Sequence, residues 1–261
     1  MSVKREQIVE IVDKAGEKVL ELYRSGFDVE QKSDDSPVTS ADLAANQIIM
    51  TELASLFPDI PIISEESKIP DYEQRKNWDR FFLIDPIDGT KDFIKKTDEF
   101  TVNIGLIEKG RPVLGVVYAP ALDKMYSGKI EEGAFLRHKG IEKTLPLKTF
   151  SKGKVLKTVI SRSHPCEKTM DLLASWEADG VEIEKISVGS SLKFCYVADG
   201  TIDIYPRFIN MNEWDTAAAQ AVVIASGAHM VDIKTKNAIT YNNESLRIPF
   251  FICTRNSDYI A

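Results

Sequence analysis

Two carboxylates stand three positions apart near the middle of the chain, where an apolar run ends. The run Phe81–Ile84 is typical of a buried strand, and it leads directly into Asp85 and Asp88. Pro86 fixes one backbone angle between them, and Gly89 lets the backbone approach a neighbouring group closely. Two anions held together repel unless a cation or a proton intervenes, and hard carboxylate oxygens suit Mg²⁺ better than zinc. These residues predict a magnesium site, with an ordinary Asp-Gly hairpin turn as the alternative.

Further acidic residues occur at the ends of other expected elements. Glu65 and Glu66 follow a short apolar strand, while Asp42 and Asp215 lie in the first turns of two expected helices. Taken singly, a carboxylate in a first helical turn complements the helix dipole, and the two glutamates would be a solvated acidic pair. Taken together with the central pair, they can complete one metal-binding site.

Four segments, in this order along the chain, resemble those of the inositol monophosphatase-like superfamily of Mg²⁺-dependent phosphatases. They are Val38–Asp42, Glu65–Glu66, Asp85–Thr90 and Trp214–Ala218, supplemented by Gly189–Ser191. One departure is Ala219, where the family usually has glycine, and it should affect helix packing more than chemistry. The resemblance implies the family's sugar-phosphatase fold, a layered αβαβα sandwich of the α/β (α+β) class.

The resemblance also implies roles for individual residues. The implied metal ligands are the side chains of Glu65, Asp85, Asp88 and Asp215 and the backbone carbonyl of Ile87. Asp42 and Thr90 match the catalytic pair that holds and activates the attacking water. The implied cofactor is Mg²⁺, two or three ions per site, and two ions about 3.5–4 Å apart can activate a shared water and stabilise the leaving oxygen. Inhibition by Li⁺ is a further implication.

Segments outside the metal-binding motifs indicate which phosphate ester is hydrolysed. Ser161–His164, Gly189–Phe194 and Tyr205–Phe208, together with Thr90–Ile94 and Phe100–Ile104, resemble the CysQ-type 3′(2′),5′-bisphosphate nucleotidases. That branch removes the 3′-phosphate of 3′-phosphoadenosine 5′-phosphate and yields AMP. The resemblance therefore implies the same hydrolysis here, by attack of a metal-activated water.

A nucleoside bisphosphate carries a second phosphate that the metal ions do not neutralise. Lys193 and Arg207 would supply positive charge for it, and His164 would contact the 5′-phosphate or the adenosine. The alternatives are solvated surface positions for the two basic residues and a helix-capping role for His164. Tyr205 and Phe208 are assigned to the core. The implied substrate contacts are Glu65, Ile87, Asp88, Gly89, Thr90, His164, Gly189, Ser190, Lys193, Arg207 and Asp215.

Two competing functions stay open at this stage. An inositol-phosphate or fructose-1,6-bisphosphate phosphatase would use the same fold, and Glu213 is compatible with a residue that binds polyol hydroxyls. Lys193 and Arg207 favour a substrate with two phosphates over inositol monophosphate. The second alternative is an inactive nucleotide-binding regulatory protein. Broken metal ligands would be expected in such a protein, whereas here all the carboxylates, Asp42 and Thr90 are intact.

Hydrophobic periodicity predicts the elements that position these residues in the first half of the chain. A helix is predicted over residues 4–24, and a second begins at Ser40 as its N-cap. The apolar face of the second helix is predicted to be Leu43, Met50, Leu53 and Phe57. The predicted strands are 62–64, 81–84, 101–107, 112–118, 124–127 and 133–136.

The Lys-rich, weakly patterned stretch 141–154 predicts a boundary between two halves of the chain. Residues 1–150 would carry most metal ligands, and residues 151–261 would complete the substrate site. In the second half the predicted strands are 155–161, 181–188 and 202–205, and the predicted helices are 166–178, 191–198 and 214–226, the last closed by Gly227. Alternating strands and helices imply layered α/β packing around a shared site.

The bulk composition is that of an ordinary globular protein. The 261 residues are 43% hydrophobic and 28% charged, with a formal net charge of −7. That charge argues against a nucleic acid or an anionic membrane as the main partner. No stretch approaches the ~20 apolar residues of a membrane span, and three cysteines without metal-type spacing predict reduced thiols and a cytoplasmic location. Peripheral attachment to the inner membrane has no visible motif, and monomer and homodimer both stay open.

Overall fold

The computed structural model describes residues 2–32, 35–148, 155–161 and 166–260. Within them the helices are α1 (Arg5–Ser25), α2 (Ser40–Leu56), α3 (Tyr72–Arg75), α4 (Thr90–Ile94), α5 (Glu167–Ala178), α6 (Leu192–Asp199) and α7 (Ala217–Ala225). The strands are β1 (Val29–Gln31), β2 (Pro37–Thr39), β3 (Ile62–Ser64), β4 (Arg80–Asp88), β5 (Thr101–Glu108), β6 (Arg111–Ala119), β7 (Lys124–Lys129), β8 (Gly133–His138), β9 (Ile141–Thr144), β10 (Val155–Ser161), β11 (Glu182–Val188), β12 (Ile204–Arg207), β13 (Met211–Asn212), β14 (His229–Asp232), β15 (Arg247–Ile248) and β16 (Phe251–Thr254). Short 3₁₀ turns lie at Pro120–Leu122 and Ser257–Tyr259.

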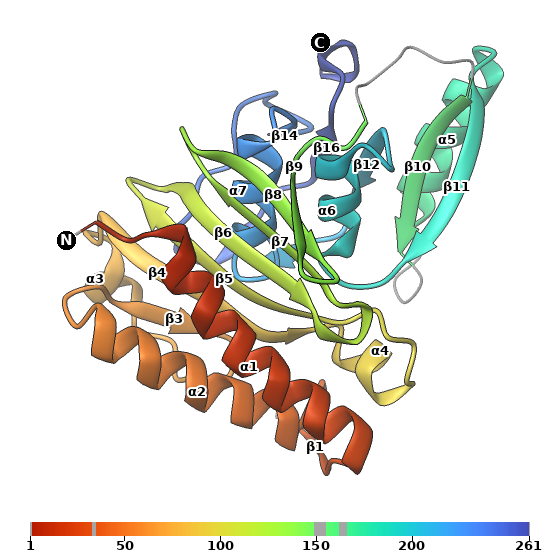
Figure 1. Cartoon of the computed structure of the whole chain (residues 1–261). Helices are drawn as coiled ribbons and strands as arrows, with labels where there is room; N and C mark the ends of the chain where they lie inside the picture. The colour runs from red at the N-terminus through yellow and green to blue at the C-terminus, as the bar shows by residue number, and fades with distance from the viewer. Residues whose placement is uncertain (1, 33–34, 149–154, 162–165, 261) are drawn as a thin grey trace.

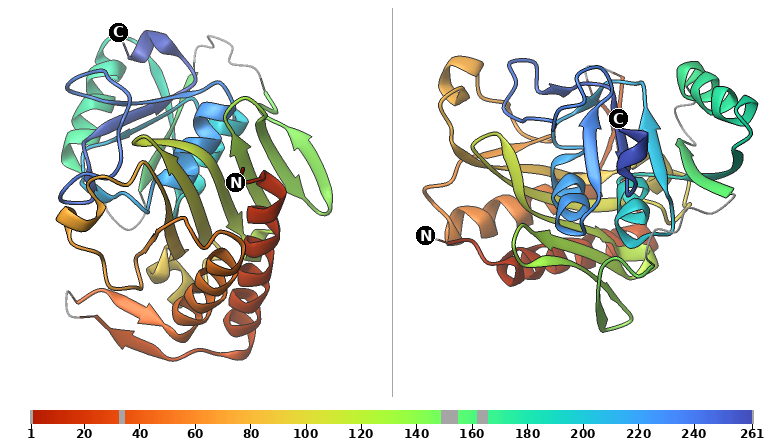
Figure 2. Two further views of the ribbon diagram at one scale, coloured as in Figure 1. Left: turned by 90° about the vertical axis from the view of Figure 1, so that its left-hand side faces the viewer. Right: turned by 90° about the horizontal axis from the view of Figure 1, so that it is seen from above.

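Helices and sheets alternate in five layers (Figure 1). Helices α1 and α2 cover one face of a seven-stranded sheet, and α6 and α7 separate its other face from a five-stranded sheet that carries α5 on its far side. Figure 2 shows the same succession of layers from two further sides. The predicted αβαβα sandwich is confirmed. Among the described residues no helix is long and apolar enough to cross a membrane.

The seven-stranded sheet has the order β3-β4-β5-β6-β7-β8-β9. Strand β3 runs parallel to β4, and each later strand pairs antiparallel with the one before it. Because parallel strands end at the same sheet edge, the residues after β3 and β4 meet there. Strand β4 is buried along nearly its whole length, which explains its continuous apolar run.

Helix α2 differs in detail from its predicted form. Its N-cap is Thr39, whose side chain accepts hydrogen bonds from the Ala41 and Asp42 backbone N–H groups, and Ser40 is already helical. Leu43 is 48% exposed, contrary to prediction. The predicted Leu53 is buried, but the rest of the buried stripe runs through Ala41, Asp42, Ala45 and Ile49, so that residues at four-residue intervals face α1 and the sheet. Met50 lies at its margin, half-buried, whereas Phe57 is buried at the helix end as predicted.

Helix α7 lies unusually close to the seven-stranded sheet because three glycines form a row across the strands beneath it. Gly105 of β5 pairs with Gly115 of β6, which pairs with Gly128 of β7. A Cβ atom at Gly115 would lie 2.0 Å from the Ala218 carbonyl oxygen, and one at Gly105 would lie 2.8 Å from the Ala218 nitrogen. Because these three residues have no side chains, the backbone at the start of α7 packs directly against the sheet.

The five-stranded sheet has the order β11-β10-β12-β16-β14, and its last two strands lie beyond the predicted elements. One hydrophobic core joins β12, β14 and β16 to α6, α7 and the seven-stranded sheet, so both halves of the chain share it. Strand β9 occupies part of the predicted boundary stretch. Residues 149–154 lie outside the described part of the chain, and the division at residue 150 stays a prediction.

Helix α7 begins at Ala217, three residues later than predicted, and Trp214–Thr216 form a turn before it. Backbone N–H groups of Thr216 and Ala217 both donate to the Glu213 carbonyl and start the helix. Gly227, with φ of +80°, follows the last helical turn as predicted. Asp215 therefore stands in the turn that precedes α7 and not inside the helix.

Candidate active site

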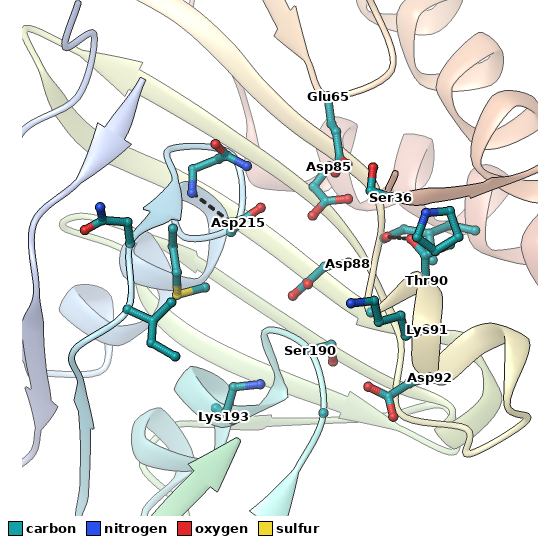
Figure 3. A pocket seen from close by; sticks show the side chains of 18 of the residues that line it. Ser36, Glu65, Asp85, Asp88, Thr90, Lys91, Asp92, Ser190, Lys193 and Asp215 are labelled. Carbon is teal, nitrogen blue, oxygen red and sulfur yellow. Dashed lines mark hydrogen bonds between the residues drawn. The ribbon is translucent and has the colours of Figure 1, made fainter. Parts of the chain in front are cut away.

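A cleft of about 360 Å³ opens between the ends of the two sheets (Figure 3). Both halves of the chain line it. Its lining residues are Ser36, Pro37, Glu65, Asp85, Ile87, Asp88, Gly89, Thr90, Lys91, Asp92, Gly189, Ser190, Lys193, Arg207, Ile209, Asn210, Met211, Asn212, Asp215 and Arg247. The set includes every implied metal ligand and, apart from His164, every implied substrate contact.

An acidic cluster occupies one wall of this cleft, assembled from three elements. Glu65 follows β3, Asp85 lies in β4, and Asp215 comes from the turn before α7. One carboxylate oxygen from each lies within 4.8 Å of the other two. The Glu65 backbone N–H donates to the Ile84 carbonyl at 3.2 Å, so the parallel pairing of β3 and β4 sets Glu65 beside Asp85.

A bulge in β4 brings Asp85 and Asp88 to the same side of the strand. Side chains three positions apart in a regular strand point to opposite faces. Here Asp85 pairs with Asn103 and Asp88 with Thr101, so three steps along β4 match two along β5. Pro86 falls within this irregularity, where its missing N–H does no harm to the strand pairing. Figure 3 shows both carboxylates turned toward the cleft.

The electrostatics of the cluster show how poorly four carboxylates tolerate one another without a cation. Burial raises the pKa of Asp85 well above its ordinary value, and the neighbouring carboxylates raise it further. Burial and the charges of Asp88 and Glu65 do the same to the pKa of Asp215. Each group is thus pushed toward protonation, which a bound cation would reverse.

The donor set fits a hard divalent cation. Asp85 is 1% exposed, and its Oδ1 has no hydrogen-bond partner among the described residues. Such a buried, unpaired carboxylate oxygen is costly unless it binds something. Ile87 lines the same cleft, and the carboxylates offered there are oxygen ligands, as Mg²⁺ requires, with no thiolate or imidazole among the described lining residues.

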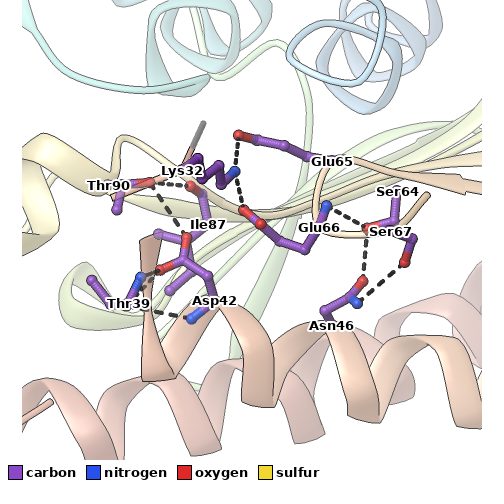
Figure 4. A network of polar contacts seen from close by, with 10 residues as sticks. All are labelled: Lys32, Thr39, Asp42, Asn46, Ser64, Glu65, Glu66, Ser67, Ile87 and Thr90. Atoms are coloured by element: carbon purple, nitrogen blue, oxygen red, sulfur yellow. Dashed lines mark hydrogen bonds and ion pairs between the residues drawn. The ribbon is translucent and has the colours of Figure 1, made fainter. Parts of the chain in front are cut away.

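Asp42 and Thr90 meet beside this cluster (Figure 4). The Thr39 N–H and hydroxyl both donate to Asp42 Oδ2, at 2.8 and 2.5 Å, which leaves Oδ1 directed at the Thr90 hydroxyl 3.3 Å away. The same hydroxyl lies 3.2 Å from the Ile87 carbonyl oxygen. Burial raises the pKa of Asp42 to about 6, although the hydrogen bonds from Thr39 lower it.

One functional neighbour of the cluster was missed by sequence reasoning. Lys32, which follows β1, places its ammonium 2.8 Å from Glu65 Oε1 and 2.6 Å from Glu66 Oε1 (Figure 4). Burial lowers the pKa of Lys32, but the hydrogen bonds to the two glutamates outweigh it and raise the pKa overall. In the sequence Lys32 stands within a polar break, and only the hairpin of β1 and β2 brings it to the metal-facing edge.

The opposite wall of the cleft carries positive charge. Ser191, the N-cap of α6, donates to Asp88 Oδ2 at 2.6 Å and ties this wall to the acidic one. Lys193 and Arg207 are 6% and 7% exposed, so neither is the solvated surface residue of the alternative interpretation. Burial lowers the pKa of Lys193 to about 8, with Asp88 raising it and Arg207 lowering it further.

His164, Glu213 and the aromatic pair Tyr205 and Phe208 have different outcomes. His164 lies outside the described residues, so its role stays a prediction. Glu213, which the sequence left compatible with binding polyol hydroxyls, does not line the cleft, and its buried carboxylate accepts hydrogen bonds from Asn242 and Asn243. Tyr205 is a core residue, as predicted, whereas Phe208 is only half-buried and belongs to no hydrophobic core cluster of the described residues, contrary to prediction.

Several cleft residues carried no recognisable sequence signal. They are Ser36, Pro37, Lys91, Asp92, Ile209, Asn210, Met211, Asn212 and Arg247. Lys91 and Asp92 fell inside a segment quoted for its resemblance but were given no role. The others come from loops and from the strands β2, β13 and β15, which have two or three residues each and are too short to show a period in the sequence.

Comparison with known proteins places the chain among close relatives. The model of the inositol monophosphatase family matches residues 2–255. The 3′(2′),5′-bisphosphate nucleotidase CysQ of Salmonella typhimurium is 44% identical over 251 residues, 95% of this chain and 98% of the relative. The protein of the same name from Haemophilus influenzae is 34% identical, covering 97% of this chain and 93% of its own length.

Solved structures agree with these sequence matches. CysQ from Bacteroides thetaiotaomicron, a bacterial member of the inositol monophosphatase family, superposes with a TM-score of 0.85 at 35% identity, over 97% of both chains. An IMPase of Thermotoga maritima gives 0.73 at 26% identity, over 97% of this chain and 92% of that one. The agreement extends from α1 to the last strand of the second sheet, and the chain belongs to the inositol monophosphatase family.

Proposed function

We propose that this chain is a Mg²⁺-dependent 3′(2′),5′-bisphosphate nucleotidase, which hydrolyses the 3′-phosphate of 3′-phosphoadenosine 5′-phosphate to AMP and inorganic phosphate. The observation that carries the proposal is the two-walled cleft, with an acidic cluster on one side and two buried cations, Lys193 and Arg207, on the other. Relatives at 34–44% identity over nearly the whole chain bear the name of this activity.

The acidic wall is proposed to hold two or three Mg²⁺ ions. The ligands would be the side chains of Glu65, Asp85, Asp88 and Asp215 and the carbonyl of Ile87. When bound, these ions neutralise charge on the phosphate and lower the pKa of a water molecule. The protein's own contribution is to fix oxygen ligands from three separate elements around one volume.

Asp42 and Thr90 are proposed to take the proton of the attacking water. The Thr90 hydroxyl accepts that proton while passing its own to Asp42 Oδ1, the atom toward which it already points. Thr39 holds the other carboxylate oxygen through two hydrogen bonds, so Asp42 cannot rotate away. The water oxygen forms a bond to phosphorus as the ester bond breaks, and the leaving 3′-oxygen takes a proton from solvent. With a pKa of about 6, Asp42 is mostly ionised at pH 7 and able to act as a base.

The basic wall is proposed to select the substrate. Lys193 and Arg207 would pair with the phosphate that the metals do not bind, since charge-assisted contacts to phosphate are strong at low exposure. Backbone groups at Gly89, Thr90, Gly189 and Ser190, which line the same cleft, would contact phosphate oxygens or ribose. His164 would complete the nucleoside end.

Hydrolysis of a set of esters tests the substrate. Phosphate release by the purified protein with Mg²⁺ is compared for 3′-phosphoadenosine 5′-phosphate, inositol 1-phosphate and fructose 1,6-bisphosphate. The nucleotide is expected to have a kcat/KM at least tenfold above either sugar ester. A preference for either sugar ester would reject this assignment and leave the fold assignment in place. Glu213, which was compatible with a polyol substrate, is buried and is not among the residues that line the cleft.

A further inference from the structure

Glu213 is a buried carboxylate that the proposed mechanism does not use. It is 0% exposed and does not line the cleft. Its Oε1 accepts hydrogen bonds from the Asn243 backbone N–H at 2.7 Å and from Asn243 Nδ2 at 2.8 Å. Its Oε2 accepts one from the Asn242 backbone N–H at 2.8 Å. Three donors from one loop therefore converge on a single side chain two positions before Asp215.

Arg75 of α3 holds the same loop from another side. The guanidinium is 2% exposed; Nη1 donates to Asn242 Oδ1 and to the Asn243 carbonyl, both at 2.9 Å, and Nη2 donates to the Glu244 carbonyl at 2.7 Å. The Asn242 side-chain amide in turn donates to the Arg75 carbonyl at 2.7 Å. Loop 242–244 is thus fixed between a buried base and a buried acid, whose desolvation is offset by these hydrogen bonds.

Glu213, Arg75 and loop 242–244 together form a clamp, which is connected to the cleft through backbone pairing. The Glu213 backbone N–H donates to the Leu246 carbonyl at 2.9 Å, and Asn212 pairs with Arg247 in the ribbon of β13 and β15. The Asn212 backbone N–H donates to Asp215 Oδ2 at 2.8 Å and so orients that carboxylate. Asn212, Asp215 and Arg247 all line the cleft.

We propose that Glu213 is a positioning residue that sets the metal affinity of the site through Asp215. By anchoring loop 242–244, its carboxylate fixes the β13–β15 ribbon, and the ribbon aims Asp215 at Glu65 and Asp85. The same ribbon presents Arg247 to the cleft, so one clamp controls a metal ligand and a portion of the substrate wall. The proposal rests on the proposed metal site but not on the identity of the phosphate ester.

The test compares Glu213→Gln with a matched variant, Asp199→Asn. The Gln side chain has one acceptor oxygen in place of two, and its NH₂ group would face an N–H donor of the loop. At least one hydrogen bond between residue 213 and loop 242–244 is therefore lost. Asp199 is equally a buried carboxylate, 4% exposed, accepting from the Thr201 N–H and the Tyr126 hydroxyl, and it lies outside the cleft lining. Both variants should lower the Tm. Isothermal titration with Mg²⁺ alone should show a dissociation constant raised about tenfold for Glu213→Gln, as for outer-shell partners of metal ligands, and unchanged for Asp199→Asn.

Kinetics supply a second readout. Excess Mg²⁺ should restore kcat in Glu213→Gln far more than in Asp199→Asn. Equal Mg²⁺ dissociation constants for wild type and folded Glu213→Gln would overturn the proposal. Should Glu213→Gln not fold, Asn243→Ala removes the side-chain amide alone, and its Mg²⁺ dissociation constant must rise in the same direction or the proposal fails. The Mg²⁺ titration contains no phosphate ester. Its result therefore holds even if the substrate test shows that the nucleotide is not the substrate.

Discussion

At the scale of single residues, the site is built from groups that oppose the stability of the fold. Asp85 is nearly inaccessible, has one carboxylate oxygen without a hydrogen-bond partner among the described residues, and is surrounded by like charges. Lys193, on the other wall, is a buried ammonium with a lowered pKa. Buried charged groups of this kind are found at functional sites, where a bound ligand compensates for the solvation that burial removes. The two walls would bind ligands of opposite charge, cations on the acidic wall and phosphate on the basic wall.

The charge of Lys193 predicts a pH dependence. Since its pKa is about 8 in the free protein, Lys193 is cationic below that pH and neutral above it. The kcat/KM for the bisphosphate should therefore fall as pH rises through about 8, by about tenfold, the worth of one charge-assisted hydrogen bond. Lys193→Arg, which stays charged, should remove that alkaline limb, and Lys193→Met should lower kcat/KM at all pH values. An alkaline limb that is unchanged in Lys193→Arg would show that another group causes it.

Residue types and spacing predicted the pair Asp85 and Asp88, whereas Glu65 and Asp215 joined the predicted site through the family resemblance of their segments. Lys32 and Glu213 show where that reasoning ends. Lys32 reaches Glu65 only through hairpin geometry, and Glu213 turns away from the cleft because three N–H donors attract it on the other side. Neither contact has a local sequence period. The direction in which a side chain points depends on partners that are distant along the chain.

At the scale of elements, two local irregularities create the site. The bulge in β4 turns Asp88 to the side of Asp85. The glycine row under α7 lets the helix start almost on the sheet surface, so that Asp215 reaches the strand end. Without the bulge in β4, Asp85 and Asp88 would point to opposite faces of the sheet. With larger residues in the glycine row, Asp215 would lie farther from them. The elements therefore matter to function through their defects as much as through their regular segments.

The glycine row predicts a coupled loss of stability and metal affinity. In Gly115→Ala the new methyl group would lie 2.0 Å from the Ala218 carbonyl oxygen, so α7 must move. Overpacking of this kind costs about 1–3 kcal/mol of unfolding free energy, and the shift should weaken Mg²⁺ binding through Asp215. The control Gly16→Ala, whose methyl group meets the Tyr118 ring under α1, should lose stability alone. Calorimetry measures the loss of stability in both variants, and Mg²⁺ titration measures the loss of metal affinity. An unchanged Mg²⁺ affinity in Gly115→Ala would show that the glycine row does not position Asp215.

Long periodic elements were predictable, and short ones with distant partners were not. Helix α1 and the antiparallel strands β5 and β6 were predicted to within about two residues, since each has a period or a local turn to define it. Strands β14 and β16 were missed: each has only four residues, β14 pairs with β16, and β16 pairs with the distant β12. The bulge in β4 was equally invisible, although Pro86 stands within it.

At the scale of the whole molecule, the acidic wall is drawn from both halves of the chain around one core. Asp85 lies in the seven-stranded sheet and Glu65 directly follows its strand β3, whereas Asp215 lies in the turn before α7, in the layer between the sheets. Metal binding should therefore stabilise the packing of layers and not only a loop. With a net charge of −7, the protein also has no general surplus of positive charge to neutralise the cluster from a distance.

Mg²⁺ should accordingly raise the Tm, and more so at higher pH. Burial raises the pKa of Asp85 and Asp215 in the folded state, so without metal their contribution to stability is greatest below about pH 4, the unfolded pKa, and is lost as pH rises through the folded values. At a hundredfold excess over the dissociation constant, bound Mg²⁺ adds about 2.7 kcal/mol, or roughly 5–11 °C. Scanning calorimetry with Mg²⁺ or with EDTA should give a larger difference at pH 8 than at pH 5. Asp85→Asn should lose most of the difference while its metal-free Tm at pH 8 is no lower than that of wild type, because a repelling charge is gone. A difference independent of pH, or one retained by Asp85→Asn, would mean that Mg²⁺ acts elsewhere on the molecule.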